Sequence, residues 1–117
     1  MKLLTKELEK KLTEAGIAEA AASVEEQRNI ADKVILAKFF YPCGYATWYA
    51  TEYLPEDRVF FGFCAVLPGG EEWGYFSLDE LQSFRGRFGL GIERDMHFSP
   101  CKVRDCRELQ KFAHKWS

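Results

Sequence analysis

Four cysteines and two histidines are the side chains of this sequence that offer metal or thiol chemistry. Cys101 and Cys106 form a C-x4-C pair, a loop long enough to present two thiolates to one tetrahedral ion at about 2.3 Å. Cys43 lies in a Pro-Cys-Gly turn, from which a thiolate can point outward. The fourth ligand would be Cys64 or His114, and Cys64 is favoured because His114 would lie about 12 Å from Cys106 along one helix. We therefore expect a structural zinc ion bound by these four cysteines.

The zinc prediction competes with simpler roles for the same thiols. A C-x4-C pair without C-x2-C pairs on both sides is a weak zinc pattern, so ordinary thiols and, less readily, disulfides stay open. A catalytic cysteine would need His97 or His114 beside a thiol, and no local signature supports that pairing. Glu93 and Asp95 are most simply a solvated strand face, because Arg94 stands between them.

Motifs of the common enzyme classes are absent from the sequence. It contains no P-loop, no metalloprotease helix and no hydrolase elbow. Gly86, Gly89 and Gly91 follow a predicted helix and precede a predicted strand, which is the reverse of a dinucleotide-binding turn. A zinc ion with four protein ligands would also leave no position for a water nucleophile. We therefore expect a protein that is not an enzyme.

Residues 36–76 hold most of the aromatic side chains, and the rest of the chain must cover or position them. Apolar runs alternate there with three turn-forming stretches, Pro-Cys-Gly, Leu-Pro-Glu-Asp and Pro-Gly-Gly. This pattern predicts an antiparallel meander. Its strands are expected at residues 34–41, 46–53, 59–67 and 72–76, with a fifth strand at 92–98. In the second strand, alternation would place odd-numbered and even-numbered side chains on opposite faces of the sheet.

Helices are expected before and after the sheet. Thr5 can cap an amphipathic helix that Gly16 would end in the left-handed conformation. Ser77 and Glu80 form a capping box, in which each side chain can bond the backbone amide of the other residue. Further helices are expected at residues 17–33, with loose docking, at about 78–85 and at 103–115.

Length and composition fit one domain. A chain of 117 residues with 47% hydrophobic and 29% charged residues is ordinary for a soluble domain. We expect an α+β fold in which residues 1–33 are helical, residues 34–98 form the sheet core with one helix, and residues 99–117 form a C-terminal helical segment. The charges in MKLLTKELEKKL predict no secretory leader, and no apolar run reaches the ~20 residues of a membrane span. A cytoplasmic location with reduced thiols is therefore expected.

Charge is distributed unevenly along the chain. Residues 39–89 hold seven acidic and three basic side chains, whereas residues 90–117 hold four acidic and six basic ones. The acidic middle should repel a phosphate backbone, so direct nucleic-acid binding is not expected there, although the basic tail can contact phosphate locally. A basic protein surface is the better electrostatic partner.

Aromatic side chains beside acidic ones form the candidate binding surface. So small a domain is not expected to bury all of its large aromatic residues, and aromatic residues rimmed by charge are typical of protein interfaces. The candidate partner-binding residues are Trp48, Tyr49, Glu52, Tyr53, Glu56, Asp57, Glu71, Glu72 and Trp73. The alternative is that these aromatic residues form the core and that the acids keep the sheet edges soluble.

Four stretches of the chain, together with the leading LLTKELEKKL, carry a family resemblance. KFFYPCGYATWYATEY, FFGFCAVL, EEWGYFSLDELQSFRG and FGLGIERDMHF resemble a bacterial and phage single-domain family of unknown function, carried by plasmids, conjugative elements and prophages. The most specific parts are WGYFSLDEL and GLGIERD. The resemblance implies an α+β domain from a mobile element and supplies no catalytic residues. Cys43, Cys101, Cys106 and the C-terminal helix depart from the family pattern.

The resemblance and the charge distribution together suggest an inhibitor that binds a protein. For a phage or mobile-element protein, the natural target is a host defence nuclease of the nucleic-acid-guided, Cas9 type. An acidic aromatic face can occupy a basic groove and block loading of target DNA, as an anti-CRISPR protein would. The alternative is a nucleic-acid-associated accessory protein of conjugation or replication that uses the basic tail, and a cysteine-dependent enzyme is the third possibility.

Overall fold

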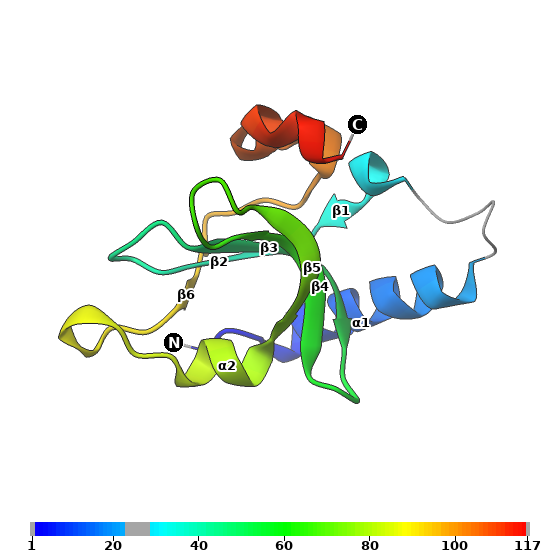
Figure 1. Cartoon of the computed structure of the whole chain (residues 1–117). Coiled ribbons are helices and arrows are strands. Elements are labelled where there is room, and N and C mark those ends of the chain that lie inside the picture. Colours follow the sequence, from blue (N-terminus) through cyan, green and yellow to red (C-terminus); the bar gives the residue numbers. More distant parts are fainter. Residues whose placement is uncertain (1, 23–28, 117) are drawn as a thin grey trace.

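An antiparallel sheet of five strands forms the centre of the protein in a computed structural model that describes residues 2–22 and 29–116 (Figure 1). The strands are β2 (Ala37–Phe40), β3 (Thr47–Leu54), β4 (Val59–Ala65), β5 (Glu72–Ser77) and β6 (Glu93–Arg94), in the spatial order β5-β4-β3-β2-β6. A separate two-stranded sheet joins β1 (Val34–Ile35) to β7 (Cys101–Lys102). The predicted α+β fold with an antiparallel meander is therefore confirmed.

Helical segments flank this sheet. They are α1 (Lys6–Ala21), η1 (Ile30–Asp32), α2 (Leu78–Ser83), η2 (Arg87–Gly89), η3 (Val103–Asp105) and η4 (Arg107–Lys115), where η marks a 3₁₀ segment. In the described part of the chain, no helix is both long and apolar enough to span a membrane.

The N-cap roles predicted for Thr5 and Ser77 are confirmed. The side chain of Thr5 accepts a hydrogen bond from the Leu8 amide at 3.2 Å, and the side chain of Ser77 accepts one from the Glu80 amide at 3.1 Å. Each bond satisfies an amide that the first turn of a helix leaves without an intrahelical partner.

The predicted end of the first helix at Gly16 is wrong, because α1 continues to Ala21. A Cβ atom on Gly16 would lie 3.1 Å from the carbonyl oxygen of Tyr53, so the glycine lets α1 approach β3 closely. The predicted helix at 17–33 is therefore partly a continuation of α1. Residues 23–28 of it lie outside the described residues, and its end is the short η1 turn.

Two predicted strands are shorter than expected. The strand predicted at 34–41 divides at Leu36, because β1 leaves the main sheet to pair with β7, and the strand predicted at 92–98 reduces to the two residues of β6. The helix predicted at 103–115 consists of the 3₁₀ segments η3 and η4. Gln110 supports this tight winding, since its side-chain amide donates to the carbonyl oxygens of Arg104 and Cys106.

A β-bulge in β3 changes which side chains face which side of the sheet. Ala50 pairs with Gly62 and Glu52 pairs with Phe61, so Thr51 is an extra residue without a partner in β4. The regular alternation predicted for this strand holds only as far as Ala50. Beyond the bulge, Tyr53 packs into the same core as Ala50.

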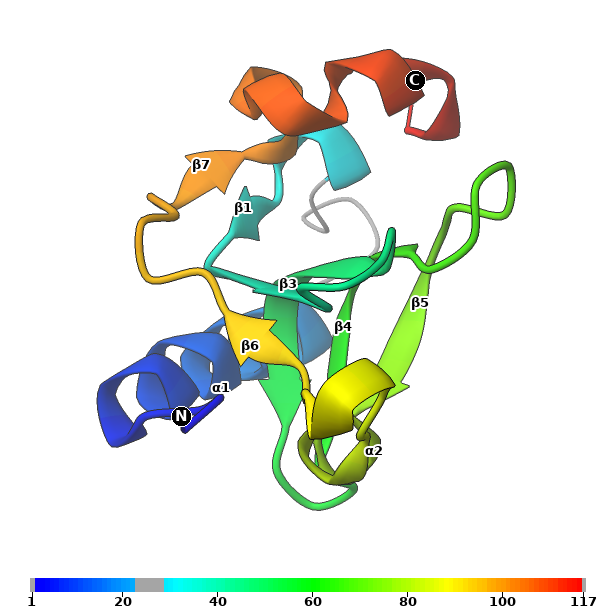
Figure 2. The ribbon, with the colours of Figure 1, turned by 90° about the vertical axis from the view of Figure 1, so that its left-hand side faces the viewer.

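The sheet separates two apolar cores. The first contains Leu12 of α1, Phe39, Phe60 and Leu81 of α2, and the second contains Phe63 with side chains of β1, η3 and η4. Figure 2 shows the C-terminal segment on the opposite side of the sheet from α2. Both faces of the sheet are thus covered, and hollows remain at its ends.

Candidate functional site

The four cysteines do not form one cluster. Cys43 is exposed in the turn after β2, Cys64 packs against the first core, and Cys101 and Cys106 belong to the second core. All four are free thiols, and within residues 2–22 and 29–116 no group of three or more His, Cys, Asp or Glu side chains could hold a metal ion. The arrangement therefore does not fit the predicted four-cysteine zinc site. Elemental analysis tests that prediction, since about one zinc per chain would require a different cysteine geometry.

Two of the thiols, Cys64 and Cys101, have a raised pKa. Burial raises the pKa of the Cys64 thiol to about 11. Burial, followed by a hydrogen bond with Cys106, raises the pKa of Cys101. His97 and His114 are both exposed. Because the thiolate is the reactive form, these shifts make Cys64 and Cys101 poor nucleophiles.

The nine predicted partner-binding residues do not form one surface. Tyr49 is only 5% exposed and Tyr53 only 3%, and they lie in the two different cores. Tyr49 donates a hydrogen bond to Glu108 at 2.7 Å across the second core. Glu71 is buried in the turn before β5, where it accepts hydrogen bonds from the Tyr45 hydroxyl and the Gly69 amide. These three residues serve the fold, as the alternative interpretation predicted for the aromatic ones.

The other predicted partner-binding residues lie apart from one another, at different ends and on different faces of the sheet. Trp48 and Glu72 are both in register with Cys64, so their side chains lie on the same face at one end. Trp73 packs against the second core, on the other face. Glu56 and Asp57 are exposed in the turn between β3 and β4, and Glu52 lines a pocket beside the bulge.

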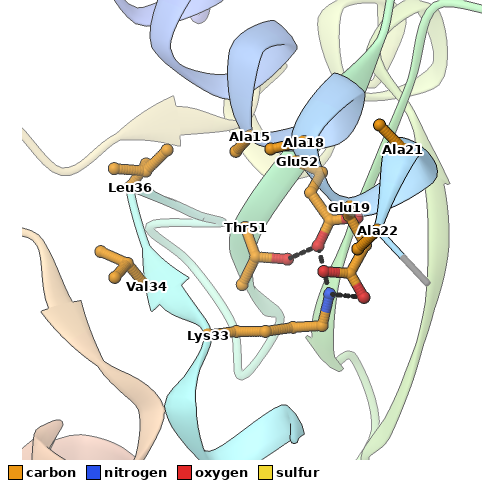
Figure 3. Close-up of a pocket in the computed structure, with 10 residues that line it drawn as sticks. All are labelled: Ala15, Ala18, Glu19, Ala21, Ala22, Lys33, Val34, Leu36, Thr51 and Glu52. Atoms are coloured by element: carbon orange, nitrogen blue, oxygen red, sulfur yellow. Dashed lines mark hydrogen bonds and ion pairs between the residues drawn. The ribbon is translucent and has the colours of Figure 1, made fainter. Parts of the chain in front are cut away.

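This charged pocket lies between α1, β1 and the bulge of β3, and it has a volume of about 390 Å³ (Figure 3). We define it by its polar residues Glu19, Lys33, Thr51 and Glu52. Its apolar wall comes from the alanines Ala15, Ala18, Ala21 and Ala22 at the end of α1, with Val34 and Leu36 opposite.

Lys33 is the centre of the charged pocket. Its ammonium lies 2.6 Å from Oε2 of Glu52 and 3.5 Å from Oε1 of Glu19, and the residue is only 8% exposed. The hydroxyl of Thr51 donates a hydrogen bond to the same Oε2 of Glu52 at 3.0 Å. The ammonium also lies 5.3 Å from the centre of the Phe61 ring, which favours its positive charge. The bulge supplies two members of this group, since it sets Thr51 and Glu52 side by side at the pocket.

The charges of this pocket suit the binding of a ligand. Of the four polar side chains that line it among residues 2–22 and 29–116, two are acidic and one is basic, so these described residues carry one net negative charge. The pocket can therefore attract a cation or a hydrogen-bond donor.

A second hollow, the apolar groove, lies between α2 and the β2–β3 hairpin. It has a volume of about 320 Å³ and is lined mainly by Tyr41, Trp48, Val66, Leu81, Phe84 and Ile92, with Glu80 at its edge. The rings of Tyr41 and Phe84 meet edge to face with centroids 5.4 Å apart. Phe84 and Val66 remain 45% and 42% exposed, so the groove offers open apolar area.

The loop after α2 is fixed to the groove. The hydroxyl of Tyr41 accepts a hydrogen bond from the Arg87 amide at 2.7 Å, and a Cβ on Gly86 would lie 2.2 Å from that hydroxyl. The next residue, Phe88, has φ of 59° and is 88% exposed. A bulky residue in this left-handed conformation is uncommon, and an aromatic ring held outward in it is a candidate contact for a partner.

Trp48 and Glu52, both predicted partner-binding residues, line the two hollows, whereas Lys33, Glu19, Tyr41 and Phe84 were not predicted. No local signal marks the Lys33–Glu52 pair, because the two residues are 19 positions apart and meet only through the fold. The apolar groove left one trace in the sequence. The glycine-rich link after α2 includes Gly86, whose missing side chain makes room for Tyr41.

Comparison with known proteins gives one match. Over residues 3–112, the chain matches a family described as a protein of unknown function (DUF2958). No curated protein and no solved structure matches the chain.

Proposed function

The chain belongs to the family of proteins of unknown function (DUF2958), and we propose that it is a non-enzymatic inhibitor that binds a protein through the apolar groove. The proposed source is a phage or another mobile genetic element. The proposed target is a nucleic-acid-guided nuclease of the Cas9 type, whose loading with target DNA the bound inhibitor would block.

The open apolar groove is the observation that carries this proposal. Interfaces concentrate their binding energy in a few aromatic or aliphatic side chains that a partner covers completely. Tyr41, Trp48 and Phe84 meet this description, because they are aromatic, partly exposed and held in place by contacts with α2 and the hairpin.

Charge around the groove supports a basic partner. Glu80 lies at the edge of the groove, and Glu72 is exposed on the face that also carries Trp48. The channel that holds the guide and target strands in a Cas9-type nuclease is positively charged. Acidic side chains beside an apolar centre can therefore compete with nucleic acid for such a channel.

A cleavage assay tests the proposal. Guide-loaded Cas9-type nuclease is mixed with increasing amounts of the protein before target DNA is added. We expect inhibition by the wild type and a shift of the half-inhibitory concentration by about tenfold or more for Phe84→Glu, which places a charge in the groove.

Tyr75→Glu is the matched control for Phe84→Glu. Tyr75 is an aromatic residue that is 67% exposed on β5, and it does not line the groove. Its variant should inhibit like the wild type. The proposal fails if the wild type leaves cleavage unchanged, or if both variants lose inhibition equally.

A nucleic-acid-associated accessory protein is the second candidate. Lys102, Arg104, Arg107 and Lys111 are exposed on the C-terminal segment, although Arg104 pairs with Asp32 at 2.5 Å. Mobility-shift experiments at low and high salt separate the two candidates. Binding that falls steeply with salt supports the accessory role, because release of counterions makes phosphate binding dependent on salt.

A further inference from the structure

We infer that the charged pocket binds a guanidinium or ammonium group carried on a short aliphatic stem. The pocket shares no lining residue with the apolar groove, so this site is separate from the one proposed for the inhibitor function. The inference rests on the charge, the free hydrogen-bonding capacity and the shape of the pocket.

Among the described residues, the polar side chains of the charged pocket leave one negative charge unbalanced. Glu19 and Glu52 both approach the ammonium of Lys33, which can neutralise only one of them. The side chains of Lys33 and Glu52 are only 10% and 13% exposed, so bulk water screens this excess poorly. A cation entering the pocket would balance the second carboxylate.

One carboxylate oxygen is available to a ligand. Lys33 and Thr51 both meet Oε2 of Glu52, so within the described part of the chain Oε1 is left to accept a hydrogen bond from outside. Glu19 meets Lys33 at 3.5 Å, a longer and weaker contact, and its side chain is 28% exposed. A guanidinium has several N–H donors in one plane and can bond both carboxylates together.

The walls of the charged pocket suit an aliphatic stem. Three alanines of α1 and its C-cap residue Ala22 line it, and these small side chains keep the space open. Val34 and Leu36 supply apolar surface on the other side, and Figure 3 shows both side chains on the wall across from the alanines of α1. A volume of about 390 Å³ is at the small end of ligand pockets, which matches one amino-acid side chain or a small amine.

Calorimetric titration with N-acetyl-arginine amide tests the inference, with N-acetyl-citrulline amide as the neutral probe of the same shape. Agmatine forms a second arm, which separates a small free cation from an arginine within a peptide. We expect the two cationic probes to bind and the citrulline probe to bind about tenfold more weakly or not at all. Equal binding of the arginine and citrulline probes would contradict a cation site.

Two variants place the binding at the charged pocket. Glu19→Gln should weaken binding of the arginine probe by about tenfold, because it removes the unbalanced charge. Glu14→Gln is its matched control, since Glu14 is an exposed acid on the same helix and does not line the pocket. Ala18→Trp fills the pocket without changing charge, and Ala18 is exposed, so the fold should tolerate it.

The expected order of affinities is therefore wild type and Glu14→Gln together, followed by Glu19→Gln and then Ala18→Trp. The inference is overturned if none of the cationic probes binds at millimolar concentration. It is also overturned if Glu14→Gln and Glu19→Gln weaken binding equally, or if Ala18→Trp binds like the wild type.

Discussion

The charged pocket and the apolar groove are two hollows of similar size built in opposite ways. The charged pocket brings together Glu19, Lys33 and Glu52, which come from three separate segments and compensate one another's charges only in part. The apolar groove is lined mainly by aromatic and aliphatic side chains around Trp48 and Phe84. The charged pocket forms only because the fold brings distant residues together. The apolar groove owes its binding capacity mainly to its exposed apolar area.

Because the two hollows are built differently, their variants should change different properties, the free energy of unfolding in one case and the affinity for a partner in the other. Removing Lys33 from the charged pocket leaves a carboxylate poorly solvated, so this change should affect folding first. A change at the open edge of the apolar groove alters area that the isolated protein leaves exposed, so it should affect partner binding first. Variants of the two hollows can therefore be distinguished by which measurement they change.

The largest effect is expected for Lys33→Ala. Removing the ammonium leaves Glu52 without its cation at a site where the carboxylate is only 13% exposed, so the free energy of unfolding should fall by about 3 kcal/mol. Urea denaturation measures this change. Lys11→Ala is the control, because Lys11 pairs with Glu7 on the exposed side of α1 and should lose at most about 1 kcal/mol. Similar small losses in both variants would show that the pocket network contributes little.

The next largest effect is expected for Gly62→Ala, beside the bulge that shapes the charged pocket. A Cβ on Gly62 would lie 1.8 Å from the carbonyl oxygen of Tyr49, so the backbone would have to shift, at a cost of about 1–3 kcal/mol. Gly74 is the matched control, since it pairs with Gly62 across the sheet and a Cβ there would meet nothing within 4 Å. Thermal unfolding should show a clear loss for Gly62→Ala and none for Gly74→Ala. Equal behaviour of the two variants would contradict the close approach.

A stabilising change is predicted at the loop beside the apolar groove. Phe88→Gly should raise the free energy of unfolding by about 1 kcal/mol, because glycine adopts φ of 59° without the penalty of a side chain. The comparison variant is Leu90→Gly, where φ is −77° and no such gain is expected. If Phe88→Gly is destabilising, the exposed ring makes contacts that outweigh the strain.

The smallest effect concerns Glu71, an acid that serves the fold and belongs to neither hollow. A hydrogen bond from Tyr45 lowers the pKa of Glu71, so its contribution to stability is present above its unfolded pKa and is lost as pH falls through the folded pKa. Tyr45→Phe should therefore be less stable than the wild type at pH 7, and the gap in stability should shrink as pH falls below the usual glutamate pKa of about 4.3. Urea midpoints measured across this range check the sign, and a gap that does not change with pH would contradict it.

The sequence predicted those parts of the fold that depend on local signals. The caps at Thr5 and Ser77 and the turns of the meander were correct, because each rests on the chemistry of a few adjacent residues. The role of Gly16 and the bulge at Thr51 were not predictable, because each depends on how separate segments approach one another.

The candidate site was less predictable than the fold, for the same reason. Tyr49 and Tyr53 look alike in the sequence as aromatic residues beside acids, yet the sheet buries them on its two sides. Lys33 gains its role only when the fold brings it to Glu52. The spacing of Cys101 and Cys106 suggested a metal site, but spacing along the chain does not fix where Cys43 and Cys64 lie.

The most direct test of the central claim is the dissociation constant of the protein for guide-loaded Cas9-type nuclease, measured for the wild type, Phe84→Glu and Tyr75→Glu. If the apolar groove is the binding surface, the wild type and Tyr75→Glu should bind equally. The dissociation constant of Phe84→Glu should be higher by about tenfold or more. No binding by the wild type would contradict the proposed target. Equal constants for all three proteins would contradict the groove.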